Sequence, residues 1–484
     1  MKLFNSLSRR PETLAPIEEG RVVMYVCGLT PYDSAHIGHA RAYVSFDVLK
    51  RQLIKRGLSV MHIQNVTDVD DKIIRRCRET GADPRALTEK NHSEALGLFG
   101  RLNILPADVY PKVTGHIPEI IAMVQSLIGR GHAYETETGV YFSISSFPSY
   151  GALSGQDLEQ IRAGSRFDVD ESKRDAADFA LWKKTKGEIL EFDSPWGRGR
   201  PGWHIECSAM SRKYAGRTLD VHGGARDLIF PHHENEIAQS EAATGEKFCN
   251  CWVHNGFLTV GGEKMSKSLG NFITLAQALQ KNTPNALRLF YLQAHYRSPL
   301  DYDEDALEAA EESVERIFNS LGLIREAAAS GAGHEDADFR ARSADFIAKF
   351  KSHMEDDLNT PEALASLFGL LRLANGHIAS GRHDGKALAE AAGEIEGMLY
   401  VLGLKEPQPS LEAKAEALNA ILGALGATAA GSAQEALDKL ISMRDDARKN
   451  KDYAASDLIR AKLKGAGIIL EDKAGADGVR WKMA

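Results

Sequence analysis

The 484-residue chain contains only five cysteines, and it lacks the long apolar segments that mark exported or membrane-embedded proteins. No uninterrupted apolar run reaches the roughly 20 residues that a transmembrane helix needs. The first residues, MKLFNSLSRRPETLAP, contain no apolar core of the kind found in signal peptides. Five cysteines in a chain of this length do not form a disulfide framework, so we expect free thiols or metal ligands in a reducing cytoplasm.

An excess of positive charge is also absent, because 59 Lys and Arg are outnumbered by 67 Asp and Glu, for a formal net charge of −8. The overall charge therefore gives no sign of nucleic-acid binding, although a local patch would suffice. From residue 436 onwards 11 Lys and Arg accompany 8 Asp and Glu, so the tail is locally basic. An ordinary solvated surface explains this charge equally simply.

Two common nucleotide-binding patterns are missing or unconvincing. No G-x-x-x-x-G-K-[ST] loop occurs, so a nucleoside triphosphate would have to be bound in another way. The stretch GRGRPG at 197–202 matches G-x-G-x-x-G, but a true dinucleotide fingerprint follows a strand and opens a helix. Here EFDSPW precedes the pattern and Pro201 interrupts it, so we expect no nicotinamide or flavin site.

Strand and helix patterns alternate near the N-terminus. Residues 22–27 form a short β-branched run typical of a buried strand, residues 38–56 have helical spacing, and residues 58–66 form a second strand pattern. Strand, helix and strand in this order predict a βαβ unit of a parallel sheet. Ligands of such sheets bind at the C-terminal ends of the strands, where Cys27 is expected to lie.

We predict an α/β fold class: a Rossmann-like parallel-sheet catalytic domain with an insertion, followed by a helical bundle and a small C-terminal domain. The predicted ranges are 1–119 and 201–248 for the halves of the sheet domain, 120–200 for the insertion, 249–305 for a region after the sheet, 306–405 for the bundle and 412–484 for the C-terminal domain.

The motif HIGH lies at the predicted strand-to-helix crossing. His36 and His39 are three residues apart, so they lie on the same side of a first helical turn. Gly38 leaves room for a ligand near the backbone, and a helix N-terminus offers unpaired N–H groups to a phosphate. Taken alone, the motif fits two surface histidines that cap a helix equally well.

A glycine- and lysine-rich stretch, GGEKMSKSLGN, follows at residues 261–271. Lys264 and Lys267 place two ammonium groups near one another, and Ser266 adds a hydroxyl between them. Such a loop can neutralise charge that develops in a phosphoryl or nucleotidyl transfer. A solvated lysine loop is the simpler alternative.

Residues of metal-ligand type are spread over three segments. His232 and Glu236 are four residues apart on a predicted helix, so both project from one face. With Cys27 and Cys207 they would offer two sulfurs, one nitrogen and one oxygen to a zinc ion. The sequence alone does not show that the four meet in space.

Other candidate ligands remain open at this stage. Cys249 and Cys251 form a close pair, but one intervening residue is unusual for structural zinc. His233 lacks a ligand four residues later, where Ile237 stands. Three further histidines carry no geometric argument: His204, His222 and His254.

HIGH followed about 230 residues later by KMSKS resembles the signature pair of class I aminoacyl-tRNA synthetases. Within that family the chain is similar to the cysteinyl-tRNA synthetases over nearly its whole length. Eight segments carry this resemblance: MYVCGLTPYDSAHIGHAR, NVTDVDDKI, DFALWK, GRPGWHIECSAM, DLIFPHHENEIAQSEA, GFLTVGGEKMSKSLGNF, DDLNTPEAL and GVRWKM. His39 is a departure, because many members have Asn at this position.

The resemblance implies roles for individual residues. One zinc ion per subunit would be held by residues Cys27, Cys207, His232 and Glu236. The cysteine pocket would be lined by Trp203, with Thr67 and Asp227 around the same site. The residues that would bind ATP are His36, Gly38, His39, Lys264, Ser266 and Lys267. Of these, the ones that would catalyse activation of cysteine are His36, His39, Lys264 and Lys267. The resemblance also makes 249–305 a stem-contact region and 412–484 an anticodon-binding domain, with tRNA contacts from Arg448, Lys449, Arg480 and Trp481.

The expected reaction joins L-cysteine to the 3′ end of tRNA-Cys through cysteinyl-adenylate, with ATP and Mg²⁺. A steric pocket separates cysteine from serine poorly, at about 10²-fold, whereas a zinc ion favours a thiolate strongly over a hydroxyl. We therefore expect zinc to recognise the substrate thiolate. A cytoplasmic monomer with no membrane partner is expected, although no residue pattern specifies the oligomeric state.

Three alternatives are distinguishable. The cysteine ligase of mycothiol synthesis shares this core but lacks an anticodon domain, whereas this chain continues for about 75 residues after KEPQPS. A non-enzymatic RNA-binding relative would be expected to have lost lysines or ligands that are present here. A protein in which zinc is merely structural would not catalyse cysteine-dependent exchange between ATP and pyrophosphate.

Overall fold

The computed structural model contains two compact units, Met1–Lys405 and Glu406–Ala484. Its described residues are 1–157, 172–216, 218–265, 270–330, 335–381, 383–407, 411–472 and 479–483. Among these residues no helix is both long and apolar enough to cross a lipid bilayer.

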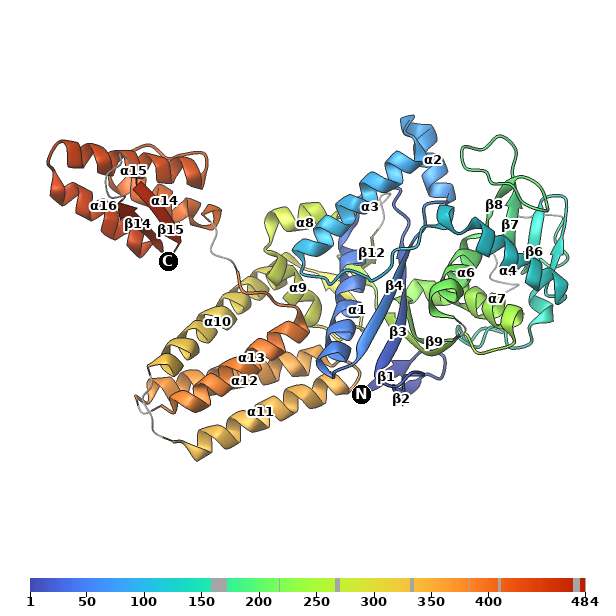
Figure 1. Ribbon diagram of the computed structural model, residues 1–484, viewed down its shortest axis with the longest axis horizontal. Coiled ribbons are helices and arrows are strands. Elements are labelled where there is room, and N and C mark those ends of the chain that lie inside the picture. The colour runs from blue at the N-terminus through green and yellow to red at the C-terminus, as the bar shows by residue number, and fades with distance from the viewer. Residues whose placement is uncertain are drawn as a thin grey trace. The chain divides into compact units, whose positions relative to one another are not determined.

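A four-stranded parallel sheet forms the centre of the first unit (Figure 1). Its spatial order is β10-β9-β3-β4, and every neighbouring pair is parallel. The strands are β3 (Arg21–Leu29), β4 (Ser59–Val66), β9 (Leu219–Ala225) and β10 (Cys249–Asn255). The chain runs from β3 to one side and later returns to the other side of β3, so the strand order reverses between β3 and β9. In sheets of this kind ligands bind at that point, beyond the carboxyl ends of the strands.

Strand β10 differs from the predicted domain limits, which ended the second half of the sheet at residue 248. Cys249 pairs with Leu219 and Asn255 with Ala225, so β10 is an edge strand of the central sheet. Six of its seven residues are buried, as expected for a strand of a covered parallel sheet. Its Cys-Asn-Cys start therefore belongs to the sheet.

Alternate residues of β3 face two different cores. Val22, Met24 and Val26 belong to the core that contains α1 (Ile37–Lys55), whereas Tyr25 and Cys27 belong to a separate core. That second core also receives residues of α6 (Trp203–Ala215) and α7 (Glu234–Thr244). Figure 1 shows α1 on one side of the sheet and the two later helices on the other. The period of two in a strand thus places Cys27 against α6 and α7.

The insertion between β4 and β9 has a sheet of its own. Four antiparallel strands in the order β5-β6-β7-β8 form this sheet. Residues 158–171, within the predicted insertion, lie outside the described residues. The elements from β4 to the sheet's last strand are α2 (Asp71–Thr80), α3 (Pro84–Arg101), α4 (Ile117–Gly129), β5 (Ala133–Glu135), β6 (Gly139–Phe142), β7 (Phe179–Lys184) and β8 (Gly199–Pro201).

Smaller elements flank the central sheet. A two-stranded N-terminal sheet pairs β1 with β2, and a three-stranded sheet has the order β12-β11-β13. Two helices separate β12 from β13. The bounds are β1 (Lys2–Asn5), β2 (Arg10–Thr13), β11 (Leu258–Val260), β12 (Glu263–Lys264), α8 (Leu275–Lys281), α9 (Pro284–Leu292) and β13 (Leu300–Tyr302).

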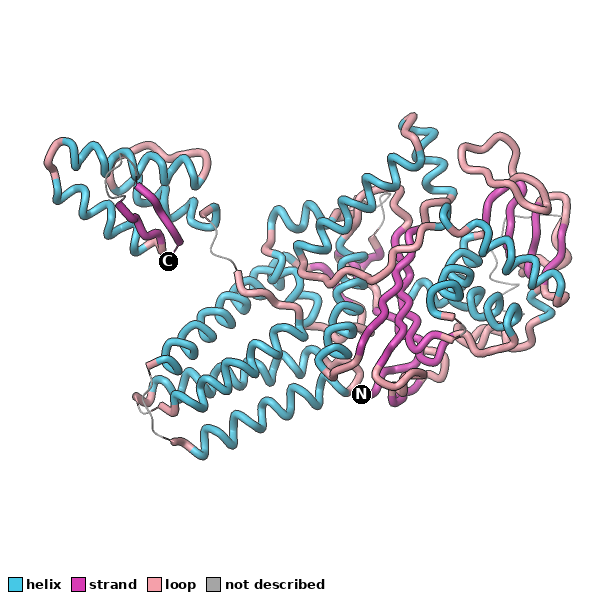
Figure 2. The backbone as a smooth tube through the Cα atoms, viewed as in Figure 1, coloured by secondary structure: helices cyan, strands magenta, loops and turns pink. Residues whose placement is uncertain are grey.

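Four helices form the bundle that the sequence predicts, and Figure 2 shows them without intervening strands. They are α10 (Glu304–Ala329), α11 (Ala337–Glu355), α12 (Thr360–Ala379) and α13 (Gly385–Leu402). The bundle shares one continuous apolar core with α1 and α9, so it belongs to the same compact unit as the sheet. The predicted limit at residue 306 is therefore a change of secondary structure within that unit.

A buried ionic anchor joins the bundle to the sheet layer. Asp47 on α1 accepts hydrogen bonds from Arg288 on α9 and from Arg51, the latter at 2.7 Å. Arg288 also donates to the carbonyls of Leu102 (2.9 Å) and Leu402 (2.6 Å), the latter at the end of α13. All three ionic side chains are at most 3% exposed, so each charge depends on its partners.

The second unit has a separate core of leucines, isoleucines and alanines. Its elements are α14 (Ala415–Ala424), α15 (Ala433–Lys449), α16 (Tyr453–Gly465), β14 (Ile468–Asp472) and β15 (Val479–Met483). The two strands form an antiparallel hairpin in which Leu470 is opposite Trp481.

The anchor makes a stability prediction. Asp47→Asn leaves the guanidinium groups of Arg288 and Arg51 buried without their counter-charge, so we expect a loss of about 3–5 kcal/mol. Thermal and urea denaturation at pH 7 measure this loss. Asp345→Asn, which removes an exposed partner of Lys349, is the control and should change stability little. Equal stability of the two variants would contradict the claim that the buried ion pairs of Asp47 stabilise the fold.

Candidate active site

A cavity of about 330 Å³ opens at the carboxyl ends of β3 and β9. Cys27 and Trp203 line one part of it, and the histidines of the HIGH motif line another. Asp227 and Gly38 also lie on its wall. The cavity therefore unites residues that the sequence places about 200 positions apart, at the place where the strand order reverses.

The HIGH motif forms the cap of α1. The Nδ1 atom of His36 accepts from the backbone N–H groups of Gly38 (3.1 Å) and His39 (3.3 Å), and Nδ1 of His39 accepts from the N–H of His36 (3.3 Å). The two rings stack with centroids 3.5 Å apart. A Cβ atom at Gly38 would lie 3.0 Å from the His36 ring and 3.1 Å from Met265, so glycine keeps this corner open.

This cap corrects one expectation. The N–H groups of the first turn were predicted to be free for a phosphate, but those of Gly38 and His39 bind His36 and that of Ile37 binds the carbonyl of Ile273 at 3.3 Å. Burial lowers the pKa of His36 to about 4, and burial likewise holds the pKa of His39 well below its usual value. Both rings are therefore neutral at pH 7 and can act as hydrogen-bond donors without net charge.

Cys27, Cys207, His232 and Glu236 meet in one buried cluster. One ligand atom from each lies within 4.8 Å of the others. Nε2 of His232 is 3.0 Å from Oε1 of Glu236, and Sγ of Cys27 is 3.7 Å from the same oxygen. Strand β3 supplies the first residue, α6 the second, and the start of α7 with the turn before it supplies the other pair.

The protonation states of the cluster suit a metal. The hydrogen bond from Cys27 lowers the pKa of Cys207 to about 6 despite burial. Burial opposes a charge on His232, but Glu236 and Cys207 raise its pKa to about 10. Burial likewise opposes the charge on Glu236, whose pKa His222 and His232 lower to about 2. Cys207 and Glu236 are thus ionised, whereas burial raises the pKa of Cys27 well above its usual value, so Cys27 and His232 would each lose a proton to a bound metal.

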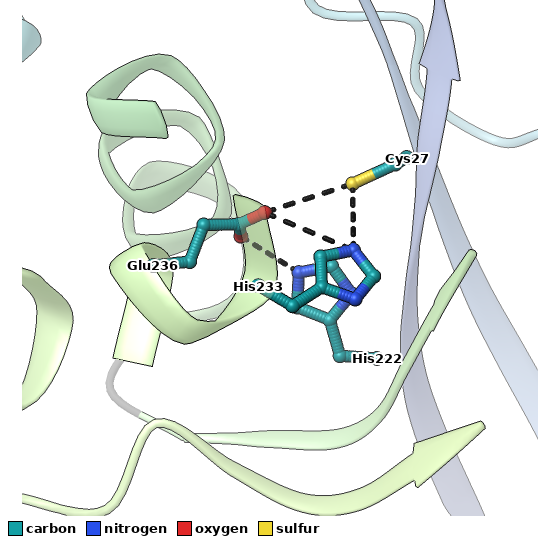
Figure 3. Close-up of side chains that lie close together, drawn as sticks. All are labelled: Cys27, His222, His233 and Glu236. Atoms are coloured by element: carbon teal, nitrogen blue, oxygen red, sulfur yellow. Dashed lines mark hydrogen bonds and ion pairs between the residues drawn. The ribbon is translucent and has the colours of Figure 1, made fainter. Parts of the chain in front are cut away.

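Two further histidines surround this cluster, and Figure 3 shows them beside Cys27 and Glu236. Nε2 of His222 contacts Oε2 of Glu236 at 2.8 Å, and Nε2 of His233 contacts Sγ of Cys27 at 3.2 Å. With Cys27 and Glu236 they form a second group within 4.8 Å. His233 in turn contacts His254 at 2.7 Å, so this side of the cluster is a hydrogen-bonded row of imidazoles.

Both groups offer atoms that zinc accepts, and they share Cys27 and Glu236. The first group adds a second sulfur and His232, whereas the imidazoles of the second group contact Glu236 and Cys27. Ligands of metal sites are commonly oriented by such outer hydrogen bonds. The described residues therefore fit zinc at Cys27, Cys207, His232 and Glu236. His222 was missed as an orienting residue, because only the pairing of β9 with β3 brings it beside Cys27.

The remaining predicted site residues take different positions. Trp203 is 41% exposed and stacks on His232 with ring centroids 4.3 Å apart. Thr67 does not line the cavity, because it is buried and accepts a hydrogen bond from Asn65 at 3.1 Å. Cys249 and Cys251 pack in different apolar cores, and neither belongs to a group of possible metal ligands among the described residues.

The lysine-rich stretch is described in part. Lys264 lies in β12, and only its backbone is described, while Ser266 and Lys267 lie outside the described residues. In the second unit Arg448 and Lys449 are exposed in the last turn of α15. Arg480 and Trp481 lie on β15.

Comparison with family models matches both parts of the first unit. Residues 13–312 match the model "tRNA synthetases class I (C) catalytic domain". Residues 349–406, in the helical bundle, match the "DALR domain" model.

Solved structures of other synthetases share the fold. A Mycobacterium tuberculosis methionyl-tRNA synthetase in complex with methionyl-adenylate aligns with a TM-score of 0.59 at 16% identity, covering 87% of this chain and 94% of that one. A putative arginyl-tRNA synthetase from Campylobacter jejuni aligns with a TM-score of 0.57 at 15% identity, covering 82% and 95%.

Sequence relatives are much closer. Cysteine–tRNA ligases from Heliobacterium modesticaldum and Desulforudis audaxviator are each 47% identical, with 100% of both chains covered. The enzyme from Thermococcus onnurineus is 44% identical, covering 100% of this chain and 99% of its own. The match includes the C-terminal unit, so the mycothiol-type ligase is not favoured. The chain belongs to the cysteine–tRNA ligase family of class I aminoacyl-tRNA synthetases.

Proposed function

We propose that zinc at Cys27, Cys207, His232 and Glu236 recognises the thiolate of L-cysteine while the HIGH turn binds ATP in the same cavity. The observation that carries this proposal is the position of Cys27, which belongs both to the buried ligand cluster and to the cavity wall. The amino-acid side chain and its carboxylate would thus be held at two ends of one space.

Zinc bound there supplies a Lewis acid that prefers a thiolate to a hydroxyl. The protein's own residues set the rest of the selection. His222 and His233 orient the ligands Glu236 and Cys27 through the contacts at 2.8 and 3.2 Å. Trp203, stacked on His232, lines the cavity next to the ligand cluster. Serine would then be rejected because its hydroxyl is a poor zinc ligand. A steric pocket alone would discriminate poorly between serine and cysteine.

Activation is proposed to occur by attack of the cysteine carboxylate on the α-phosphorus of ATP. The bond between the α-phosphorus and the bridging oxygen breaks, and pyrophosphate leaves with Mg²⁺. Because His36 and His39 are neutral, they would donate hydrogen bonds to the phosphate, and the positive charge would come from Lys264 and Lys267. Asp227 on the cavity wall can pair with the substrate ammonium.

Transfer completes the proposed reaction. The 2′-hydroxyl of the terminal adenosine of tRNA-Cys attacks the carbonyl carbon of cysteinyl-adenylate, and AMP leaves with the bonding electrons. No protein nucleophile is needed. Arg448, Lys449, Arg480 and Trp481 are proposed to contact the tRNA, the charged groups at phosphates and the indole by stacking on a base. A cytoplasmic monomer remains part of this proposal.

Replacing one ligand tests the zinc assignment. Cys207→Ser should lose the bound zinc, measured as metal per chain by plasma emission, and with it cysteine-dependent exchange of pyrophosphate into ATP. Cys77→Ser, at a buried thiol on α2 away from the cluster, should keep both. Serine should drive no exchange in either protein. Robust exchange after loss of zinc would make the metal structural at most and would refute the specificity argument.

The neutrality of His36 makes a pH prediction. Burial places its pKa at about 4, so its protonation does not change between pH 6 and 8. His36→Asn should lower the kcat of exchange on the order of 10²-fold by loss of one hydrogen bond in the transition state. The ratio of the wild-type kcat to the variant kcat should stay constant between pH 6 and 8, since the titration of ATP affects both proteins equally. A ratio that falls as the pH drops through about 6.5 would show that His36 titrates normally and would contradict its buried state.

Charge at the end of α15 is tested with tRNA. The double variant Arg448→Gln/Lys449→Gln should raise the KM for tRNA-Cys and flatten the dependence of log KM on log salt by about one to two units. Exchange of pyrophosphate should be unchanged. Lys213→Gln, an exposed cation in the first unit, is the matched control. An unchanged salt dependence in the double variant would remove these residues from the tRNA interface.

A further inference from the structure

Arg41 is a buried cation in the second turn of α1, just beyond the HIGH motif. The residue is 1% exposed, and its guanidinium donates to two backbone carbonyls, those of Phe257 and Ser298. Among the described residues no carboxylate lies within ion-pair distance of it. Its charge is therefore balanced by peptide dipoles alone.

The two carbonyls belong to the small sheet that leads into the lysine-rich stretch. Phe257 directly precedes β11, and Ser298 lies two residues before β13. The N–H of Leu300 also donates to the Phe257 carbonyl, at 3.0 Å. Strand β11 pairs in turn with β12, where Thr259 is opposite Lys264. Arg41 thus holds both parallel strands of this sheet at their starting ends.

The segment after the lysine-rich stretch is fastened to the same helix. The N–H of Leu275 donates to the carbonyl of Ala35 at 2.8 Å, and the N–H of Ile37 donates to that of Ile273 at 3.3 Å. Gly256, beside Phe257, packs so closely that a Cβ there would lie 2.4 Å from the Ser298 carbonyl. Described residues on either side of the stretch are therefore fixed to the beginning of α1.

A buried arginine is a costly means of stabilising a fold. Removing a guanidinium from water costs free energy that carbonyl partners offset only in part, and burial accordingly lowers the pKa of Arg41 to about 10. An apolar side chain could fill the same space. The planar guanidinium offers instead two donors at a fixed separation, which sets the spacing between two groups that both bind it.

We propose that Arg41 is a positioning residue for ATP activation, which fixes the distance between the His36–His39 turn and the sheet that carries Lys264. It contacts neither substrate. The inference rests on the proposed function, because it assumes that these two motifs act on the same ATP. A displacement of about 1 Å between such groups can cost on the order of 10²-fold in rate.

Steady-state exchange kinetics test the proposal, with ATP and cysteine varied separately. Arg41→Met should lower kcat/KM for ATP on the order of 10²-fold, while the KM for cysteine and the zinc content stay at wild-type values. Arg41→Lys, whose ammonium lacks the planar fork, should have a kcat/KM for ATP between those of the wild type and Arg41→Met. Transfer from added cysteinyl-adenylate to tRNA-Cys should be unaffected in both variants. If Arg41→Met fails to fold, Arg41→Lys carries the comparison.

Arg51→Met is the matched control, since Arg51 is another buried arginine of α1, which donates to Asp47 and to backbone carbonyls far from the lysine-rich stretch. It should lower the melting temperature and leave the dependence on ATP intact. If both variants lower the melting temperature equally and neither changes kcat/KM for ATP, Arg41 has only a structural role and the proposal is overturned. A wild-type protein without cysteine-dependent exchange would instead refute the proposed function, and this inference with it.

Discussion

The two faces of strand β3 are the constraint on which the site depends. A strand presents successive side chains to opposite faces, so Val22, Met24 and Val26 pack on α1 while Tyr25 and Cys27 face α6 and α7. The helix that follows the strand carries the histidines of the HIGH motif, and the opposite face receives the metal ligands. A shift of one residue in register would exchange the two faces and would move Cys27 away from Cys207. One short strand thus fixes both halves of the cavity.

Buried charge in the first unit serves two distinct purposes. At Asp47 one carboxylate bridges two guanidinium groups, which also donate to backbone carbonyls, and the result is an anchor between the sheet layer and the bundle. In the ligand cluster, by contrast, Cys207 and Glu236 are ionised beside a protonated His232. A metal ion would replace that proton and the thiol proton of Cys27, whose pKa burial raises. The Asp47 anchor needs no further ion, whereas the cluster of Cys27, Cys207, His232 and Glu236 is suited to bind a cation.

Much of this arrangement was predictable from local pattern. The βαβ unit, the placement of Cys27 at a strand end and the shared face of His232 and Glu236 follow from periodicity, and the four ligands meet as proposed. What could not be predicted depends on contacts distant in sequence. His222 becomes an orienting residue only because β9 lies beside β3, and Cys249 and Cys251 pack in different apolar cores although they are close in sequence. The sequence left helix capping by the two histidines open, and their spacing did not reveal which atoms the rings bind.

The neutrality of the two HIGH histidines changes how the site must work. A phosphorus under attack by a carboxylate gathers negative charge, and neutral imidazoles can only donate hydrogen bonds to it. In the proposed reaction net positive charge would come from outside the α1 turn, and we propose the lysine-rich stretch and Mg²⁺ as its source. Electrostatic stabilisation by a fixed group falls steeply with misplacement, so the position of the sheet that leads into that stretch matters as much as the presence of its lysines. A buried arginine that joins this sheet to α1 through two carbonyls satisfies that requirement without entering the reaction itself.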